Sequence, residues 1–148
     1  MHETKIRVQY YETDRMGVVH HSNYIRYFET GRTEFIRSRG ISYADIEAGG
    51  VLMPIISAEC RYFHPACYDE LLTIRTKISE EITARICFAY EIYNESAQLV
   101  CTGSTALAFV DAATRRPVRP PEAVARLLRG TANGAIAYLS TKQAPANS

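Results

Sequence analysis

The chain has 148 residues, of which 47% are hydrophobic and 22% are charged. This composition is typical of a folded domain and excludes wholesale disorder. The length suits a single domain, which can bury roughly 70% of the surface of its unfolded chain. The formal net charge is only +1. The basic excess of a nucleic-acid-binding surface is therefore absent, and we expect no nucleic-acid partner.

The cysteines and the start of the chain indicate where the protein works. The four cysteines form no Cys-x-x-Cys pair and have no histidine at zinc-ligand spacing; they are Cys60, Cys67, Cys87 and Cys101. Residues 1–5 are polar and charged and lack the apolar core of a signal peptide. No segment approaches the ~18 apolar residues of a membrane span. We therefore predict a cytoplasmic protein with reduced thiols and no metal ion.

The first predicted element is a strand from Lys5 to Tyr11. Ile6, Val8 and Tyr10 alternate with polar residues, so they share the face that a strand turns toward the core. This pattern makes Tyr10 a core aromatic residue. The alternation stops at residues 12–17, where aspartate and glycine indicate a turn.

A long helix follows this turn. Ser22 and Asn23 are both good N-cap residues, and Gly40 suits the position just after a helix C-terminus. The residues of one face recur at helical spacing; they are Tyr24, Tyr27, Phe28, Gly31 and Phe35. A glycine inside a helix costs about 1 kcal/mol relative to alanine. We expect it at Gly31 because the helix approaches a sheet closely there.

Four further strand candidates follow the helix. They span Met53–Phe63, Glu70–Ser79, Ile82–Tyr93 and Gln98–Val110. Their length and close spacing predict an antiparallel meander. Pro121 then precedes a short predicted helix from Glu122 to Arg129. Residues 131–148 show no clear period, and we expect a flexible tail there.

These elements predict an α+β fold in residues 1–130, in which one long helix lies across a five-stranded antiparallel sheet. The sheet covers only one flank of the helix. We therefore expect a homo-oligomer that extends the sheet and buries the other flank. A domain of this size also has little room to enclose a large substrate alone, which favours a site shared between subunits.

One segment carries the residue types of a catalytic site. Residues 10–24 place Glu12, Asp14, His20 and His21 between a predicted strand and the start of the helix. The free N–H groups at a helix start favour negative charge, as an oxyanion hole requires. A carboxylate there can activate water or attack a carbonyl, and a histidine can orient the carboxylate or protonate a leaving group.

Each of these residues also has an ordinary structural explanation. Asp14 is equally suited to bond the backbone of a turn, and Gly17 to meet a conformational requirement of that turn. Glu12 fits a solvated charge or an ion-pair partner. The two histidines fit helix-cap or surface positions. Composition and spacing alone therefore indicate a site that can polarise a substrate, and they leave its chemistry open.

The order and spacing of the segment closely resemble one enzyme family. The family pattern is Tyr-x-Asp-Thr-Asp-x-x-Gly-x-Val-x-His-x-x-Tyr, followed by Phe-Glu-x-x-Arg-x-Glu, and residues 10–37 follow it. The chain resembles the hotdog-fold acyl-CoA thioesterases of the 4-hydroxybenzoyl-CoA thioesterase type. It is most similar to their bacterial short-chain branch, which is associated with the Tol-Pal system. The likeness continues more loosely to about Pro121. The sequence departs from the pattern at Glu12, where the family usually has Asp, and at His20, where it often has Tyr or Phe.

The resemblance implies a hotdog fold and the hydrolysis of a short- to medium-chain acyl-CoA. No cofactor or metal is implied, since coenzyme A is part of the substrate. The family's catalytic carboxylate maps onto Asp14, its histidine onto His21 and its strand tyrosine onto Tyr10, with Asp14 as general base or nucleophile. The expected substrate contacts are Gly17, Val19, Ser22, Asn23, Tyr24 and Arg61, with Arg85, Arg115 and Arg116 as further candidates for the CoA phosphates. In related structures the site lies at a dimer interface, so a homodimer or homotetramer is implied.

Other functions stay open. A second hypothesis is the hydrolysis of an aromatic or polyketide-type thioester, carried by CoA or by an acyl carrier protein. A hotdog dehydratase is disfavoured because dehydratases place their acid and histidine differently. A non-catalytic acyl-CoA-binding protein would usually carry an appended DNA-binding or membrane element, and we expect the termini to be too short for one.

Overall fold

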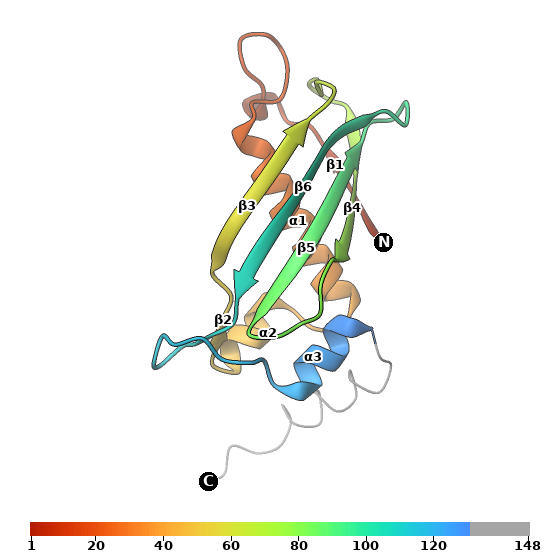
Figure 1. Cartoon of the computed structure of the whole chain (residues 1–148). Coiled ribbons are helices and arrows are strands. Elements are labelled where there is room, and N and C mark those ends of the chain that lie inside the picture. The colour runs from red at the N-terminus through yellow and green to blue at the C-terminus, as the bar shows by residue number, and fades with distance from the viewer. Residues whose placement is uncertain (131–148) are drawn as a thin grey trace.

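A five-stranded antiparallel sheet and one long helix form the body of the structure, a computed structural model that describes residues 1–130 (Figure 1). The sheet has the strand order β1-β4-β5-β6-β3. Its strands are β1 (His2–Arg7), β3 (Ile55–Tyr62), β4 (Leu71–Ile78), β5 (Arg85–Tyr93) and β6 (Leu99–Ala108). The helix α1 (Ser22–Ser38) crosses one face of this sheet. The predicted α+β architecture is confirmed.

The close approach of α1 to the sheet depends on Gly31. A Cβ atom at Gly31 would lie 2.7 Å from Thr76 Oγ1 and 2.8 Å from Ile74 Cγ2, which is closer than real Cβ atoms come to their neighbours. Both of these residues lie on β4 and are fully buried. The predicted reason for a glycine inside the helix is therefore confirmed.

A second contact fixes the middle of α1 on the sheet. The Phe28 ring stacks on the Tyr90 ring of β5 with centroids 4.4 Å apart, a favourable arrangement for two buried aromatic rings. Gly103 of β6 leaves the space that this ring fills, because a Cβ atom there would overlap with Phe28. Two glycines, one on the helix and one on the sheet, thus let aromatic and aliphatic side chains interlock.

The start of α1 differs from the prediction. Ser22 and Asn23 are the first two residues of the helix, and His21 occupies the N-cap position. The side chain of His20 takes the capping role, since its Nδ1 accepts the Ser22 N–H at 3.2 Å. The end of the helix is as predicted, because Gly40 follows it with a φ of +84°.

Strand β1 ends earlier than the alternation of its residues predicts. Val8 is fully buried, but residues Tyr10–Glu12 form a short 3-10 helix, η1, and Tyr10 is 77% exposed. The prediction that Tyr10 is a core aromatic residue of a strand is therefore wrong. The chain turns here because the Thr13 N–H and its hydroxyl both donate to the Tyr10 carbonyl, at 3.1 and 2.8 Å.

The predicted meander is correct for three strands and wrong for the fourth. Strands β4, β5 and β6 pair in sequence order, but β3 pairs with β6 rather than with β4. The connection of residues 63–70 explains the difference. It crosses the end of α1 and joins opposite sides of the sheet, so β3 becomes an edge strand. Sequence spacing does not distinguish such a crossover from a hairpin.

Two predicted strands also begin or end elsewhere. β5 begins at Arg85 rather than at Ile82, and β6 ends at Ala108 rather than at Val110. Residues on either side of the long strands form a separate pair of short strands, β2 (Val51–Leu52) and β7 (Val110–Asp111).

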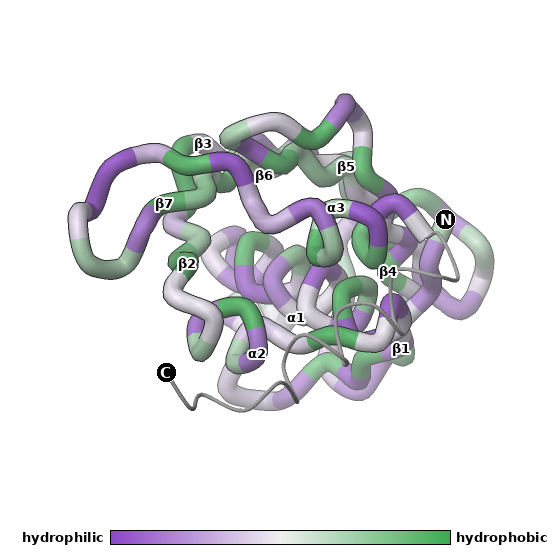
Figure 2. The backbone as a smooth tube through the Cα atoms, turned by 90° about the horizontal axis from the view of Figure 1, so that it is seen from below, coloured by the Kyte–Doolittle hydropathy of each residue, from purple (hydrophilic) through white to green (hydrophobic). Residues whose placement is uncertain are grey.

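Two short helices cover the C-terminal end of α1. They are α2 (Tyr43–Ala48) and α3 (Glu122–Arg129), and α3 has the predicted bounds. Figure 2 looks along α1 from this end and shows the sheet curling around it from β3 to β1, with α2 on the remaining side. No helix of the described residues is long and apolar enough to cross a membrane. The predicted tail, residues 131–148, lies outside the described residues.

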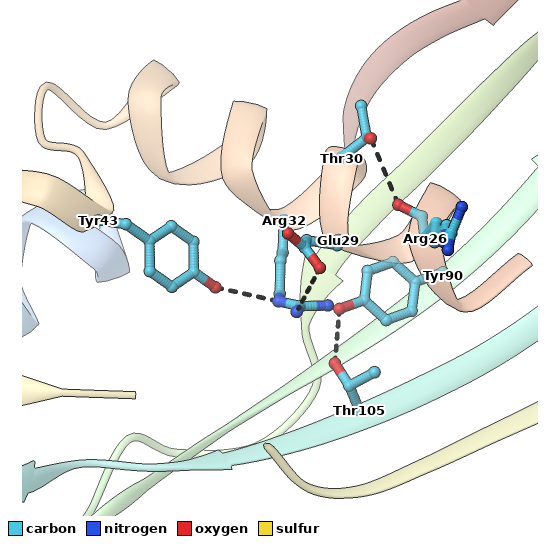
Figure 3. A network of polar contacts seen from close by, with 7 residues as sticks. All are labelled: Arg26, Glu29, Thr30, Arg32, Tyr43, Tyr90 and Thr105. Atoms are coloured by element: carbon cyan, nitrogen blue, oxygen red, sulfur yellow. Dashed lines mark hydrogen bonds and ion pairs between the residues drawn. The ribbon is translucent and has the colours of Figure 1, made fainter. Parts of the chain in front are cut away.

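A buried arginine links three of these elements (Figure 3). Arg32 of α1 is only 4% exposed, and its Nε–H donates to the Tyr43 hydroxyl of α2 at 3.0 Å. The Tyr90 hydroxyl of β5 lies beside the guanidinium and shares a 2.5 Å hydrogen bond with Thr105 of β6. Glu29 is the nearest carboxylate, at 3.9 Å from the guanidinium. A buried cation with so distant a counterion depends on these neutral oxygen atoms.

Replacing Tyr43 by phenylalanine tests this dependence. Tyr43→Phe removes the hydroxyl that accepts from the buried guanidinium, and we expect the free energy of unfolding to fall by about 1–3 kcal/mol. Urea unfolding measures the change. Tyr93→Phe is the matched control, because the Tyr93 hydroxyl lies on the outer face of the sheet, where it donates to Glu91 at 2.6 Å. Equal effects of the two substitutions would contradict this role of Tyr43.

Candidate active site

A loop of residues 13–20 joins η1 to α1 and extends beyond the end of the sheet (Figure 1). The Asp14 N–H donates to the Val18 carbonyl at 2.8 Å, and the Gly17 N–H donates to the Asp14 carbonyl at 3.0 Å. Gly17 has a φ of +77°, a conformation that other residues rarely adopt. The predicted turn is therefore present, and Gly17 meets its conformational requirement.

This loop is bound to the crossover connection between β3 and β4. The Val19 N–H donates to the Ala66 carbonyl at 2.8 Å, and Val18 pairs with Cys67 in an antiparallel bridge. Both Val19 and Ala66 are buried. Two connections that lie far apart in the sequence thus form one layer at the N-terminal end of α1.

Asp14 combines both roles that its position in the sequence allows. It is half-buried, and its Oδ1 accepts the Met16 N–H at 2.8 Å. This bond is the turn contact expected of an aspartate. The same carboxylate also lines a cavity. The turn contact therefore fixes the direction of the carboxylate that faces the cavity.

The cavity has a volume of about 390 Å³ and lies between the two connections and the first turn of α1. It brings Asp14 and His21 together. Its lining consists of Asp14, Met16, Val18, Val19, His21, Tyr24, Tyr62, Phe63, His64 and Pro65. A larger cavity of about 700 Å³ lies beside Phe35 and Leu128 at the other end of α1. None of the titratable residues of the motif lines it, so the smaller cavity is the candidate active site.

The structure separates the two histidines of the motif. The Nδ1 atom of His20 lies 2.8 Å from the Ser22 Oγ and accepts the Ser22 N–H at 3.2 Å. His20 therefore serves as a helix cap. His21 is exposed and lines the cavity beside Asp14. The two imidazole rings lie 4.1 Å apart between centroids. His21 is the histidine that a bound substrate can reach.

The backbone donors at the helix start are largely used within the chain. The Ser22 N–H is bonded to His20, and the Asn23 N–H donates to the His20 carbonyl at 2.9 Å. The Asn23 side chain is also occupied: it is 6% exposed, and its Nδ2 donates to the Glu12 carbonyl at 2.9 Å. Ser22 and Asn23 were expected to contact the substrate, but the structure places them in the framework of the loop.

Glu12 is the centre of that framework. Its Oε1 accepts the Gln9 N–H at 2.7 Å and the Tyr27 hydroxyl at 3.0 Å. Its carbonyl accepts two hydrogen bonds, one from the His20 N–H at 2.8 Å and one from the Asn23 Nδ2 at 2.9 Å. Burial, together with the Glu12 carboxylate, raises the pKa of Tyr27, so the phenol stays protonated and donates. The sequence-based interpretation of Glu12 as a solvated charge or ion-pair partner is wrong, because its neighbours in space are neutral donors.

One wall of the cavity is aromatic and has cysteines behind it. Tyr24 is buried against Tyr62, with ring centroids 5.2 Å apart. Cys60 and Cys101 lie behind these rings on β3 and β6. Burial raises the pKa of both thiols, so neither is a thiolate nucleophile at neutral pH. Among the residues that line the cavity, Asp14 is the only carboxylate.

Several residues predicted for the site lie outside the cavity. The Tyr10 ring lies edge-to-face against the Tyr68 ring, and the two ring centroids are 5.5 Å apart. Arg61 lines a separate cavity of about 200 Å³ on β3 and β6. The remaining arginine candidates, Arg85, Arg115 and Arg116, lie near the opposite end of the sheet. Within one chain, none of these side chains lies beside Asp14.

Several residues that line the cavity were not expected there from the sequence. Met16 and Val18 lie within the motif, Tyr62 is the last residue of β3, and His64 and Pro65 come from the crossover connection. The aromatic and imidazole side chains of residues 62–65 were a usable signal, but only the bridge between the two connections shows that they reach Asp14. Among the described residues, no group of three His, Cys, Asp or Glu side chains could hold a metal ion.

A curled antiparallel sheet around one long helix, with a carboxylate and a histidine at the helix start, defines a hotdog protein with a hydrolytic site. A family model described as the thioesterase-like superfamily matches residues 8–128. The chain belongs to this superfamily and is a thioester hydrolase. The fold and enzyme class that the sequence motif implied are confirmed.

Three known proteins show how far the likeness extends. The putative acyl-CoA thioesterase YneP of Bacillus subtilis is 35% identical over 121 residues, which cover 80% of this chain and 88% of that protein. The acyl-CoA thioester hydrolase YbgC of Escherichia coli O6:H1 is 29% identical over 119 residues, covering 80% and 89%. The crystal structure of a DHNA-CoA thioesterase from Staphylococcus aureus is 34% identical, with a TM-score of 0.77 and coverage of 95% and 89%.

Removal of the Glu12 side chain tests its role in holding the loop. We expect Glu12→Ala to lower kcat for thioester hydrolysis roughly 10- to 100-fold, because small displacements of catalytic groups have effects of this size. KM should change little, since Glu12 does not line the cavity. Steady-state kinetics on the folded variant measures both constants.

Glu12→Gln is the matched control, because its Oε1 can still accept from Gln9 and Tyr27. We expect it to retain most of the wild-type kcat. An alanine variant with normal kcat and a lowered melting temperature would show that Glu12 serves stability alone.

Proposed function

We propose that the protein hydrolyses acyl-CoA thioesters to the free acid and coenzyme A, with Asp14 as the catalytic carboxylate. The observation that carries this proposal is that Asp14 and His21 share one cavity at the start of α1. The names of YneP and YbgC as acyl-CoA thioesterases support coenzyme A as the carrier. We also propose that the chain belongs to the bacterial short-chain branch of the 4-hydroxybenzoyl-CoA thioesterase type, the branch associated with the Tol-Pal system.

The thioester carbonyl would lie between Asp14 and the first turn of α1. Of the N–H groups expected to form an oxyanion hole there, those of Ser22 and Asn23 are already bonded. The N–H of His21 has no acceptor among the described residues, and it is the donor we assign to the developing oxyanion. The helix dipole adds to this stabilisation.

Asp14 can act on the carbonyl carbon in two ways. As general base, it takes a proton from water while the hydroxide adds to the carbonyl, and the tetrahedral oxyanion then expels the CoA thiolate. As nucleophile, its carboxylate adds instead, expels the thiolate and forms a mixed anhydride that water hydrolyses. In both cases His21 can protonate the departing thiolate. Neither route requires a cofactor or a metal.

The cavity suits a small acyl group. Its volume of about 390 Å³ and its buried Tyr24 wall favour a short- to medium-chain acyl group. The second candidate is an aromatic acyl group, favoured by the neighbouring rings of Tyr24 and Tyr62 and by the 34% identity to a DHNA-CoA thioesterase. A panel of short, branched, medium, long and aromatic acyl-CoAs, with acyl carrier protein thioesters included, decides between them through kcat/KM.

We further propose that the enzyme is a cytoplasmic homodimer or homotetramer built through β3. This strand forms an edge of the sheet, and its large apolar side chains Ile55, Ile56 and Tyr62 are 44–55% exposed. An exposed apolar edge strand is a template for pairing with another strand. Tyr62 also lines the Asp14 cavity, so a partner paired along β3 would reach the site.

Removal of the Asp14 carboxylate tests the catalytic assignment. Asn at this position keeps the Oδ1 that accepts the Met16 N–H, but it can neither take a proton from water nor attack the carbonyl. We therefore expect Asp14→Asn to lower kcat on acyl-CoA roughly 10²–10⁴-fold. Asp69→Asn, in the neighbouring connection, is the matched control and should keep wild-type turnover. Near-normal turnover in a folded Asp14→Asn variant would reject Asp14 as the catalytic group.

A charge on the exposed edge strand tests the assembly. We expect the wild-type protein to be at least dimeric by light scattering, and Ile56→Lys to be monomeric with its activity lost. Lys5→Glu, on the opposite edge strand β1, should remain assembled and active. A monomeric and fully active wild-type enzyme would contradict a shared site.

A further inference from the structure

Two tyrosine rings are exposed beside the active site without any role in the core. Tyr10 is 77% exposed and Tyr68 is 55% exposed. Their centroids lie 5.5 Å apart and their planes meet at 85°, an edge-to-face arrangement. We refer to these two residues as the tyrosine platform. Such large apolar surfaces usually mark a binding surface when they cluster on the outside of a protein.

The backbone holds the platform in place. The Val8 N–H donates to the Glu70 carbonyl at 2.9 Å, and the Asp69 N–H donates to the Val8 carbonyl at 3.0 Å. These bonds fix Val8, two residues before Tyr10, and the two residues that follow Tyr68. The platform is therefore a preformed feature close to the contact between the two connections.

The platform is continuous with the catalytic loop. Tyr68 follows directly on Cys67, which pairs with Val18, and Val18 lines the Asp14 cavity. Tyr10 bonds through its carbonyl to Thr13, which immediately precedes Asp14. A substrate held with its thioester at Asp14 and extending out of the cavity on this side meets the platform.

A positive charge lies next to the platform. The Arg7 Nη1 donates to the carbonyl of Asp69, the residue after Tyr68, at 2.8 Å. Arg7 is exposed and takes part in no ion pair among the described residues. One of the five N–H donors of its guanidinium is used in this bond, and the others are suited to the oxygen atoms of a phosphate.

A planar aromatic surface and a guanidinium together match the two parts of a nucleotide. Purine bases stack on tyrosine rings, and phosphates bind arginine through charge-assisted hydrogen bonds. We propose that the tyrosine platform binds the adenine base of the CoA part of the substrate, with a phosphate of the nucleotide on Arg7. This inference rests on the proposed function, because it assumes that coenzyme A carries the acyl group.

The test compares two substrates that differ only in the nucleotide. One is an acyl-CoA, and the other is the same acyl group on pantetheine, which lacks the nucleotide. We expect Tyr68→Ala to raise KM for the acyl-CoA about 5- to 10-fold, the size of a lost base stacking contact. KM for the acyl-pantetheine and kcat for both substrates should stay at their wild-type values. Tyr10→Ala and Arg7→Gln should show the same selective change.

Matched controls separate a binding contact from a structural one. Tyr68→Phe keeps the ring and should restore the low KM, while Tyr93→Ala removes a tyrosine on the outer face of β5 and should change neither KM. An equal rise of KM on both substrates would show that Tyr68 only supports the loop, and it would overturn the inference. An unchanged KM for the acyl-CoA in all three variants would overturn it as well.

Calorimetric titration with free CoA makes the test independent of catalysis. The inference requires that Tyr68→Ala and Arg7→Gln weaken CoA binding relative to wild type and Tyr68→Phe. Equal affinities of all four proteins would reject it. A wild-type protein that binds CoA through the platform but turns over no acyl-CoA would instead reject the proposed function and leave the nucleotide contact established.

Discussion

The whole arrangement depends on how closely α1 lies on the sheet. Gly31 provides this closeness, because no side chain separates the helix backbone from Ile74 and Thr76. The aromatic stack of Phe28 on Tyr90, seated over Gly103, then fixes the position of the helix. A side chain at Gly31 would lift the helix and shift its N-terminus relative to the connections that carry Asp14. The packing of the core at Gly31 therefore also determines the geometry of the candidate active site.

The candidate active site is built mainly from backbone contacts between two connections rather than from side-chain packing. Asp14 is oriented by a bond to the Met16 N–H, and its loop is bound to Ala66 through Val19. Glu12 closes the framework from behind by binding residues before the loop, at its end and on the helix. The residues that hold the loop therefore lie outside the cavity. The cavity is lined by Asp14, His21 and the aromatic wall.

The sequence predicted the elements with a strong period, and local exceptions explain the errors. The long helix, its buried face, its terminal Gly40 and α3 follow from helical spacing and capping residues, which act locally. Tyr10 was misplaced because alternation continues past the last ladder bond of β1, where the chain instead turns into η1. The position of β3 was misjudged because the length of residues 63–70 permits either a hairpin or a crossover, and only tertiary contacts distinguish them.

The same distinction applies to the candidate site. The motif placed Asp14 and His21 correctly at the loop and the helix start, since both belong to one continuous segment. The contribution of residues 62–65 and the central role of Glu12 arise from contacts between distant segments, which no local pattern encodes. Ser22 and Asn23 were expected at the substrate because the helix start offers free N–H groups. In the structure both of these N–H groups donate to His20, and the Asn23 side chain donates to the Glu12 carbonyl.

The antiparallel pairing of β1 with β4 has a consequence for the order of folding. His2 pairs with Thr76 and Arg7 with Leu71, so among the described residues the first strand finds its neighbour in the sheet only near the middle of the chain. Contacts between residues so distant in sequence close late, because the entropy of forming a long loop must be overcome first. The loop with Asp14 lies inside that long closure and is tied to residues just before β4. During synthesis α1 with its Gly31 is made early, whereas the loop with Asp14 can bind Ala66 and pair with Cys67 only after the connection before β4 has been made.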